Sequence, residues 1–106
     1  MKTLCKSIPL FLFLFLLLNI NSVSAQIISS GGQHSLVICS SDSIIRAYGR
    51  NDYGQLGNGN TTNTNTPVMV SVLLEVIAVA GGIYQSVALQ KNGTVWAWGY
   101  NVYGQL

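Results

Sequence analysis

Residues Tyr48–Leu56 read YGRNDYGQL, and residues Trp98–Leu106 read WGYNVYGQL. The two stretches share the pattern Tyr/Trp-Gly-x-Asn-x-Tyr-Gly-Gln-Leu at a spacing of 50 residues. A second pair of motifs, Gly31-Gly32 and Gly81-Gly82, recurs at the same spacing. A period near 50 residues in a glycine-punctuated chain is typical of repeat architectures such as β-propellers. The duplication therefore predicts an all-β fold built from repeated units.

The strands of the repeated unit are indicated by short apolar runs between the glycine-rich signatures. Six runs have the length or alternation of short strands, and they are Ser35–Cys39, Ile44–Tyr48, Val68–Val70, Val76–Val79, Ser86–Leu89 and Thr94–Trp98. Each period therefore carries about four strands, the number in one blade of a β-propeller. We expect antiparallel four-stranded blades, with about one and a half repeats present.

Two kinds of connection are expected between these strands. Asn92-Gly93 predicts a tight hairpin with a type I′ turn, in which both central residues have positive φ. Asp42-Ser43 takes the same place in the first copy, where one additional residue predicts a longer loop or a bulge. Asn58–Thr66 (NGNTTNTNT) is polar, has no periodicity and precedes Pro67, so it predicts a flexible loop.

The residues that recur in the two copies are expected to have structural roles. They are Gly31, Gly32, His34, Gly49, Asn51, Gly54, Gln55 and Leu56, with Gly81, Gly82, Gly99, Asn101, Gly104, Gln105 and Leu106. Gly49 should end a strand at a sharp turn, and Gly54 should have positive φ. Asn51 should hold this turn by bonding the backbone two residues further on. Tyr53 should pack the turn onto the neighbouring blade, and the second copy should repeat these roles.

The first 25 residues have the layout of a secretory signal peptide. Two lysines near the start precede the unbroken apolar run Leu10–Leu18, and Val23 and Ala25 place medium and small residues at positions −3 and −1 of a cleavage point between Ala25 and Gln26. The alternative is an uncleaved membrane anchor. A spanning helix needs about 20 apolar residues, and Ile8–Ile20 offers fewer. We therefore expect a protein that is secreted or held at the cell surface.

Removal of this leader leaves a chain of balanced charge. The remaining charged residues are three basic and three acidic ones, namely Arg46, Arg50 and Lys91 with Asp42, Asp52 and Glu75. The formal net charge of +2 of the whole chain comes from the two lysines of the leader. Since no basic patch remains, we expect no nucleic-acid partner and no membrane contact apart from the leader.

Cysteine usage does not indicate a disulfide framework. Cys5 lies in the leader, so the expected mature chain holds Cys39 alone, whereas a secreted disulfide scaffold has an even number. The simplest interpretation is a small buried residue in a strand. The alternatives are an intermolecular disulfide and a partner cysteine in a longer chain.

The second copy of the signature stops at Leu106, whereas the first continues through Gly57 to Gly59. We interpret residues 26–106 as part of a longer propeller, with one repeat over about 27–76 and a truncated second repeat over 77–106. Repeat units bury their apolar faces against neighbours, and about three repeats are usually needed for stability. We therefore expect residues 26–106 alone to be marginally stable or to self-associate.

The strings GGQHSLVI and RAYGRNDYGQLGNG in the first copy, and GGIYQSVALQKNGTVWAWGYNVYGQL in the second, resemble the repeat of the regulator of chromosome condensation family. Thr66–Val70 (TPVMV) is also similar to a segment of that repeat, and the resemblance covers nearly all of residues 26–106. It departs from the pattern at Gln85, where the first copy has the family's histidine, and at Ser43, where the family has glycine. The resemblance implies a seven-bladed β-propeller when complete.

The sequence offers no set of catalytic residues. His34 is the only histidine, and the chain has neither a Gly-x-Ser-x-Gly elbow nor a phosphate-binding glycine loop. The acidic residues are scattered and have neither paired-carboxylate nor metal-ligand spacing. We expect no enzymatic activity, no cofactor and no metal, and a hydrogen-bonded structural role for His34.

A secreted protein-binding module is the function that these features favour, because propeller loops present recognition residues on a rigid scaffold. The candidate partner-binding residues are Arg50, Asp52, Asn60 and Tyr100. Guanine-nucleotide exchange on a small GTPase is the activity that names the family, but the leader disfavours it. A structural or surface-display role is the third hypothesis, and the glycosylation sequons that begin at Asn60 and Asn92 would suit it.

Overall fold

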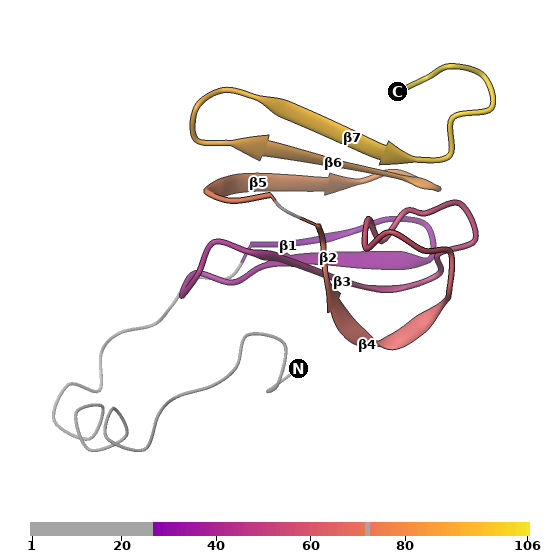
Figure 1. The fold of residues 1–106 in the computed structure, drawn as a ribbon, viewed down its shortest axis with the longest axis horizontal. Coiled ribbons are helices and arrows are strands. Elements are labelled where there is room, and N and C mark those ends of the chain that lie inside the picture. Colours follow the sequence, from indigo (N-terminus) through magenta and orange to yellow (C-terminus); the bar gives the residue numbers. More distant parts are fainter. Residues whose placement is uncertain (1–26, 72) are drawn as a thin grey trace, which may run out of the picture.

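The computed structural model describes residues 27–71 and 73–106 and folds them into two antiparallel β-sheets (Figure 1). The first sheet has the order β1-β2-β3-β4, with the strands β1 (Ile27–Ser30), β2 (His34–Ile38), β3 (Ile45–Gly49) and β4 (Thr64–Met69). The second sheet has the order β5-β6-β7, with the strands β5 (Val76–Gly81), β6 (Gln85–Gln90) and β7 (Val95–Gly99). These residues contain no helix, and the predicted all-β class is confirmed. The predicted signal peptide and its cleavage point between Ala25 and Gln26 lie outside the described residues.

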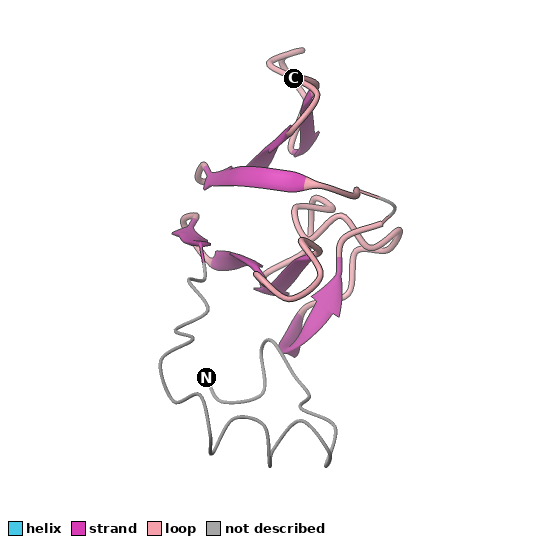
Figure 2. Ribbon diagram, turned by 90° about the vertical axis from the view of Figure 1, so that its left-hand side faces the viewer, coloured by secondary structure: helices cyan, strands magenta, loops and turns pink. Residues whose placement is uncertain are grey.

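The repeated glycine pairs lie where the two sheets meet. β5 packs against β1 and β2, and Figure 2 shows the second sheet stacked above the first. The amide of Gly32 donates a hydrogen bond of 2.9 Å to the carbonyl of Gly82. A Cβ atom on Gly81 would lie 2.5 Å from the backbone nitrogen of Gly31. The backbones are therefore too close for a side chain, which explains glycine in both copies.

The structure departs most from the sequence-based strand prediction at β1 and β4, while the other strands match the predicted runs to within two residues at each end. β1 was not among the predicted strands, and it pairs with β2 along its whole length, from Ile27 opposite Ile38 to Ser30 opposite Ser35. β4 begins at Thr64, so the end of the predicted loop belongs to a strand. Pro67 is tolerated within it because β4 is the outer strand of its sheet, where a missing amide donor costs little.

The hairpin between β6 and β7 is tight, but the predicted type I′ turn is wrong. Gly93 has a φ of 89°, whereas Asn92 is not among the described residues with positive φ. The Gly93 amide donates to the Gln90 carbonyl at 2.9 Å, and the Gln90 amide donates to the Thr94 carbonyl at 2.9 Å. Lys91 therefore joins the loop, which has three residues and places its glycine in the left-handed region.

The corresponding hairpin of the first copy is longer, as predicted, and places Ser43 at a φ of 55°. A residue with a Cβ atom loses about 1–2 kcal/mol of stability in the left-handed backbone conformation. Glycine avoids this strain, but its greater freedom in the unfolded chain offsets part of the gain. We expect Ser43→Gly to raise the free energy of unfolding by about 0.5–1 kcal/mol, measured by urea denaturation. Ser41→Gly in the same loop, at a residue without positive φ, should not stabilise the chain. Equal effects of the two substitutions would contradict this explanation.

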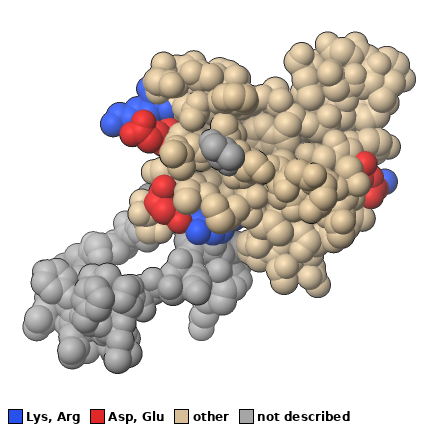
Figure 3. Space-filling model, in the orientation of Figure 1, with Lys and Arg blue, Asp and Glu red and all other residues tan. Residues whose placement is uncertain are grey.

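Charged side chains of the described residues occur in neighbouring pairs of opposite sign, and blue and red atoms lie together at separate places in Figure 3. Arg46 and Asp42 form a salt bridge of 2.9 Å, and the Arg46 guanidinium lowers the pKa of Asp42. Arg50 pairs with Asp52. The third pair, Lys91 and Glu75, is joined through the backbone, where the Lys91 amide donates to the Glu75 carbonyl at 2.9 Å. The described surface is therefore nearly neutral, in keeping with the balanced composition.

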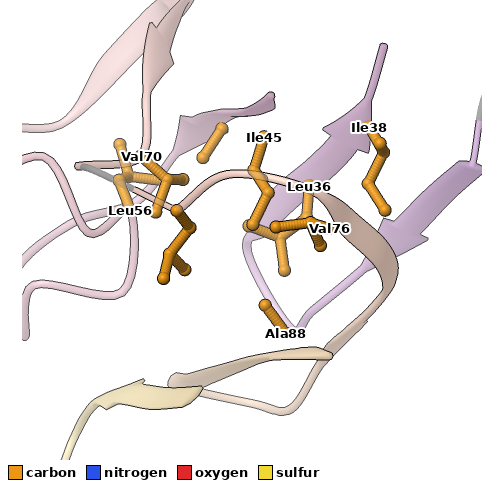
Figure 4. Close-up of a cluster of buried hydrophobic side chains, with 9 residues drawn as sticks. Leu36, Ile38, Ile45, Leu56, Val70, Val76 and Ala88 are labelled. Atoms are coloured by element: carbon orange, nitrogen blue, oxygen red, sulfur yellow. The ribbon is translucent and has the colours of Figure 1, made fainter. Parts of the chain in front are cut away.

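The main core lies between the two sheets and draws residues from both (Figure 4). Its buried members are Leu36, Ile38, Ile45, Ala47, Leu56, Val70, Leu73, Val76 and Ala88. Alternation along β2 sends Leu36 and Ile38 into this core, while Val37 packs with Cys39 and Tyr48 on the opposite face. Cys39 is fully buried, as the simplest interpretation expected, but it directly follows β2 instead of lying in a strand, and it is not a free thiol. Both faces of β2 therefore carry buried side chains.

Candidate interaction surface

The turn at residues 51–56 of the first copy, which we call the signature turn, is held by its own polar side chains. Asn51 is fully buried, and its Oδ1 accepts a bond of 2.9 Å from the Leu56 amide, five residues further on. The predicted bond two residues on is therefore wrong for Asn51. Gln55 makes a bond across two residues, but toward the start of the chain: its Oε1 accepts from the Tyr53 amide at 2.9 Å. Gly54 has the predicted positive φ, at 75°. The turn is thus closed by side chain to backbone bonds.

The second copy repeats this turn bond for bond. The Leu106 amide donates to Asn101 Oδ1 at 2.9 Å, and the Tyr103 amide donates to Gln105 Oε1 at 3.0 Å. Gly104 has a φ of 68°. The difference is burial, since Leu56 is in the core whereas Leu106 is 45% exposed. The signature therefore encodes the turn locally, and burial depends on a neighbouring sheet.

A polar seam joins the first sheet to the second. His34 Nε2 lies 2.8 Å from Ser86 Oγ, and Ser86 Oγ donates to the Gln55 carbonyl at 2.7 Å. The same carbonyl accepts a bond of 2.9 Å from the Trp98 indole. Gln55 therefore anchors β6 and β7 to the signature turn of the first copy. His34 has the hydrogen-bonded structural role that its sequence context predicted.

The proton positions in this seam follow from the donors that are present. Ser86 has one hydroxyl proton, and the Gln55 carbonyl can only accept, so Ser86 uses its proton there. Ser86 must then accept from His34 Nε2–H. His34 Nδ1 is buried without a hydrogen-bond partner, which suits an unprotonated ring nitrogen. Burial lowers the pKa of His34, an effect that the backbone of Gln85 partly opposes.

We expect the stability of the folded chain to fall as the pH drops below 6.5, the ordinary pKa of histidine. The folded-state pKa of His34 is lowered, so the unfolded state binds the proton first and the stabilisation is fully present only above that pH. The slope is at most about 1.4 kcal/mol per pH unit for one proton. Thermal unfolding between pH 5 and 8 measures it. His34→Gln, which copies Gln85 of the second repeat, should remove the dependence; a persisting slope would assign it elsewhere.

Four tyrosines gather where loops of the two sheets come together, and we call Tyr53, Tyr84, Tyr100 and Tyr103 the tyrosine surface. The Tyr53 ring lies 5.1 Å from that of Tyr84 and 4.8 Å from that of Tyr100, measured between centroids in edge-on geometry. The Tyr100 and Tyr103 centroids are 6.2 Å apart. Such pairs stabilise one another by about 0.5–1.5 kcal/mol beyond area burial. Tyr53 thus packs onto the second sheet, as predicted.

Arg50 and Asp52 border the tyrosine surface. The Arg50 guanidinium bonds Gln33 Oε1 at 2.6 Å and Asp52, and its Cζ lies 5.8 Å from the centroid of the Tyr84 ring. The carboxylate of Asp52 raises the pKa of Arg50. Arg50 and Asp52, two of the four candidate residues, thus form an ion pair with no net charge at the border of the tyrosine surface. A partner would meet a compensated ion pair rather than a free charge.

The structure brings three of the four candidate binding residues together and places the fourth in a structural role. Asp52 is paired with Arg50, the Arg50 guanidinium lies over the Tyr84 ring, and the centroid of that ring is 6.0 Å from that of Tyr100. Asn60 instead accepts a bond of 3.2 Å from Asn51 Nδ2 and one of 3.0 Å from the Thr62 amide. Tyr84 was missed because it lies in the short β5–β6 loop, where the first copy has glutamine. Only contact between the sheets reveals it.

Comparison with known proteins agrees with the geometry. The family model described as "Regulator of chromosome condensation (RCC1) repeat" matches residues 47–89, and a second model of the same repeat matches residues 76–105. Together these matches span more than half of the chain. The chain belongs to this repeat family. The signature turn, the glycine contacts and the seam are therefore features of an RCC1 repeat pair.

Relatives share the repeat over most of this chain but are much longer. The protein RCC2 homolog of Danio rerio is 37% identical over 91 residues, which cover 82% of this chain and 18% of the relative. The human E3 ubiquitin-protein ligase HERC2 is 37% identical over 83 residues, 74% of this chain and 2% of the relative. The crystal structure of Prp20p from Saccharomyces cerevisiae superposes with a TM-score of 0.64 at 25% identity, over 76% of this chain and 21% of that one. The chain spans about a fifth or less of these proteins.

Metal-binding clusters and helices able to span a membrane are both absent from the described residues. Within residues 27–71 and 73–106, no group of three or more His, Cys, Asp or Glu side chains is arranged to hold a metal ion. In the same residues, no helix has the length and hydropathy needed to cross a membrane. The tyrosine surface is the candidate site that the described residues offer.

Proposed function

We propose that this chain is a secreted protein-binding module that contacts its partner through the tyrosine surface. The observation that carries the proposal is the meeting of Tyr53, Tyr84 and Tyr100, from loops of both sheets, in one cluster of ring contacts. Tyrosine and arginine are enriched at the energetic centres of protein interfaces. Tyr103, which is 84% exposed, extends the cluster outward.

Neutrality of this surface indicates what drives binding. Arg50 is paired with Asp52, and the tyrosines contribute apolar rings with hydroxyl groups. Ile83, next to Tyr84, and Val102, next to Tyr103, are 65% and 71% exposed. Binding should therefore depend on aromatic packing and hydroxyl hydrogen bonds rather than on charge. A partner with an apolar patch rimmed by polar groups fits this chemistry.

Secretion and protein binding have separate support. The signal-peptide pattern of residues 1–25 supports export. Among related structures, that of Prp20p was described with the binding of Prp20p to Gsp1p and histones, so a protein of the same fold binds proteins. This chain spans only 21% of Prp20p, so protein binding by this chain itself is part of the proposal.

Export is tested by expressing the full chain with a carboxy-terminal epitope tag in a secreting host. We expect tagged protein in the medium with an amino terminus at Gln26. Retention in the cytosol with an intact leader would contradict export and would favour the guanine-nucleotide exchange alternative.

Binding is tested with a partner purified on the immobilised chain from the extracellular fraction of the source organism and then titrated in pure form. Tyr100→Ala and Tyr103→Ala should each weaken binding about tenfold or more, as at interface hot spots. Asn92→Ala, in the hairpin at the other end of β7, is the matched control and should bind as the parent does. Raising salt from 50 to 500 mM should change the affinity only slightly, because the surface carries no free charge. Equal binding by all variants would overturn the proposed site.

A further inference from the structure

The loop between β3 and β4 carries a motif that the proposed binding surface does not use. Asn60, Thr61 and Thr62 form the sequon Asn-x-Thr, which marks an acceptor for an N-linked glycan in exported proteins. All three residues are exposed. A second sequon begins at Asn92 in the β6–β7 hairpin, at the opposite end of the sheets (Figure 1). The two sites differ in how their backbones are held.

The side chain of Asn60 is turned so that its amide oxygen faces the protein. Its Oδ1 accepts a bond of 3.0 Å from the Thr62 amide and one of 3.2 Å from Asn51 Nδ2. A backbone amide can only donate, so the atom that faces the Thr62 amide must be the oxygen and not the nitrogen. Asn60 Nδ2 lies on the other side of the planar group and donates no hydrogen bond among the described residues. The nitrogen that a glycan would modify is therefore available.

A glycan on this nitrogen would leave the contacts of Asn60 intact. Its transfer replaces one of the two hydrogens of Nδ2 and leaves Oδ1 as an acceptor. The backbone carbonyl of Asn60 accepts from Asn51 Nδ2 at 2.9 Å, and that of Thr62 accepts from the same nitrogen at 3.2 Å. Neither bond involves Asn60 Nδ2. The signature turn therefore keeps its support when Asn60 carries a sugar.

The sequon at Asn92 is held by the hairpin itself. The Thr94 amide donates to Asn92 Oδ1 at 2.9 Å, so the side chain makes the same turn as that of Asn60. However, the Gly93 amide donates to the Gln90 carbonyl and the Thr94 carbonyl accepts from the Gln90 amide, each at 2.9 Å. Residues 60–62 make no backbone-to-backbone bond within the described part of the chain. An enzyme that reshapes the backbone of its acceptor would have to break a hairpin at Asn92 but not at Asn60.

We propose that Asn60 is an N-glycosylation site and that Asn92 remains unmodified. The co-substrate is a lipid-linked oligosaccharide pyrophosphate, which the secretory pathway supplies together with the transferase. Asn60 Nδ2 attacks the anomeric carbon of the first sugar and forms a C–N bond, while the bond from that carbon to the phosphate oxygen breaks. The lipid pyrophosphate leaves with the electron pair, and one Nδ2 proton passes to a base of the transferase. Modification rests on the export that the proposed function includes, because this transferase acts on exported chains.

The test translates the full chain, with its own leader, in a eukaryotic lysate that contains endoplasmic-reticulum microsomes. Resistance to added protease reports whether the chain has entered the vesicles, and a mass increase that peptide N-glycosidase reverses reports a glycan. We expect protected chains that carry one glycan. Protected chains without a glycan would overturn the glycosylation site alone. Chains that stay outside the vesicles would contradict export and would overturn the site with it.

Two variants locate the glycan. Thr62→Ala destroys the sequon but keeps Asn60 and the backbone bonds of residue 62, so it should abolish the modification of protected chains. Asn92→Gln is the matched control and should keep the single glycan. A glycan that persists in Thr62→Ala or disappears in Asn92→Gln would overturn the assignment to Asn60, and two glycans on the parent chain would contradict the exclusion of Asn92.

Thermal unfolding tests the orientation of the Asn60 amide. The glycosylated parent and the unmodified Thr62→Ala variant should unfold at the same temperature when both are purified from the medium of a secreting host, because both keep the bonds to Asn51. A lower unfolding temperature of the glycosylated chain would show that Nδ2 faces the protein and would contradict the proposed geometry.

Discussion

Gly49→Ala is expected to lower the free energy of unfolding by about 3 kcal/mol or more, as the sum of strained backbone and overpacking. Gly49 ends β3 with a φ of 112°, outside the regions open to residues with a side chain. A Cβ atom there would lie 2.6 Å from the carbonyl oxygen of Gln33 and 2.9 Å from the Cα of His34. Both are backbone atoms at or just before the start of β2, so they cannot rotate away as a side chain could. Urea denaturation followed by tryptophan fluorescence measures the loss.

Gly54→Ala is the matched control for this prediction. Gly54 also has positive φ, at 75°, but nothing lies within 4 Å of the place that its Cβ would take. It should therefore carry only the left-handed backbone cost of about 1–2 kcal/mol. The difference between the two variants isolates the steric clash. If both substitutions cost the same, the contact with Gln33 would have no energetic role.

Local features of this fold were predictable because they repeat in the sequence. The positive φ of Gly54 and the strand end at Gly49 follow from glycine at fixed places in a duplicated motif. β2 and β3 follow from apolar runs whose alternation is short-range. The exact hairpin geometry was not predictable from Asn92-Gly93 alone, because Lys91 enters the loop and changes which residues take positive φ.

Contacts between the sheets were the least predictable. The bond from Ser86 to the Gln55 carbonyl joins residues 31 positions apart, and no local pattern marks either of them as partners. The same is true of the packing of Tyr84 on Tyr53. Arg50, Asp52 and Tyr100 were predicted as binding residues because recognition residues are often found in loops. The same argument also selected Asn60, whose side chain instead accepts a hydrogen bond from Asn51.

Asn51→Ala should destabilise the chain by about 3 kcal/mol. The Asn51 side chain is fully buried and accepts from the Leu56 amide at 2.9 Å. Its Nδ2 donates to the carbonyls of Asn60, at 2.9 Å, and Thr62, at 3.2 Å. Alanine would leave a buried amide without an acceptor, which costs about 1–3 kcal/mol by itself, and would release two loop carbonyls. Urea denaturation measures the sum, and amide exchange at Leu56 should become faster.

Asn51→Asp divides this effect into its parts. The carboxylate keeps an acceptor for the Leu56 amide but removes the Nδ2 donor, so aspartate faces the two loop carbonyls without a proton to offer. Protection of the Leu56 amide should survive while the loop at Asn60 exchanges faster. Asn101→Ala is the matched control, because Asn101 makes the same bond to Leu106 at an exposed site and should cost less than about 1 kcal/mol. A loss as large as that of Asn51→Ala would show that the turn, rather than its burial between the sheets, is the source of the stability.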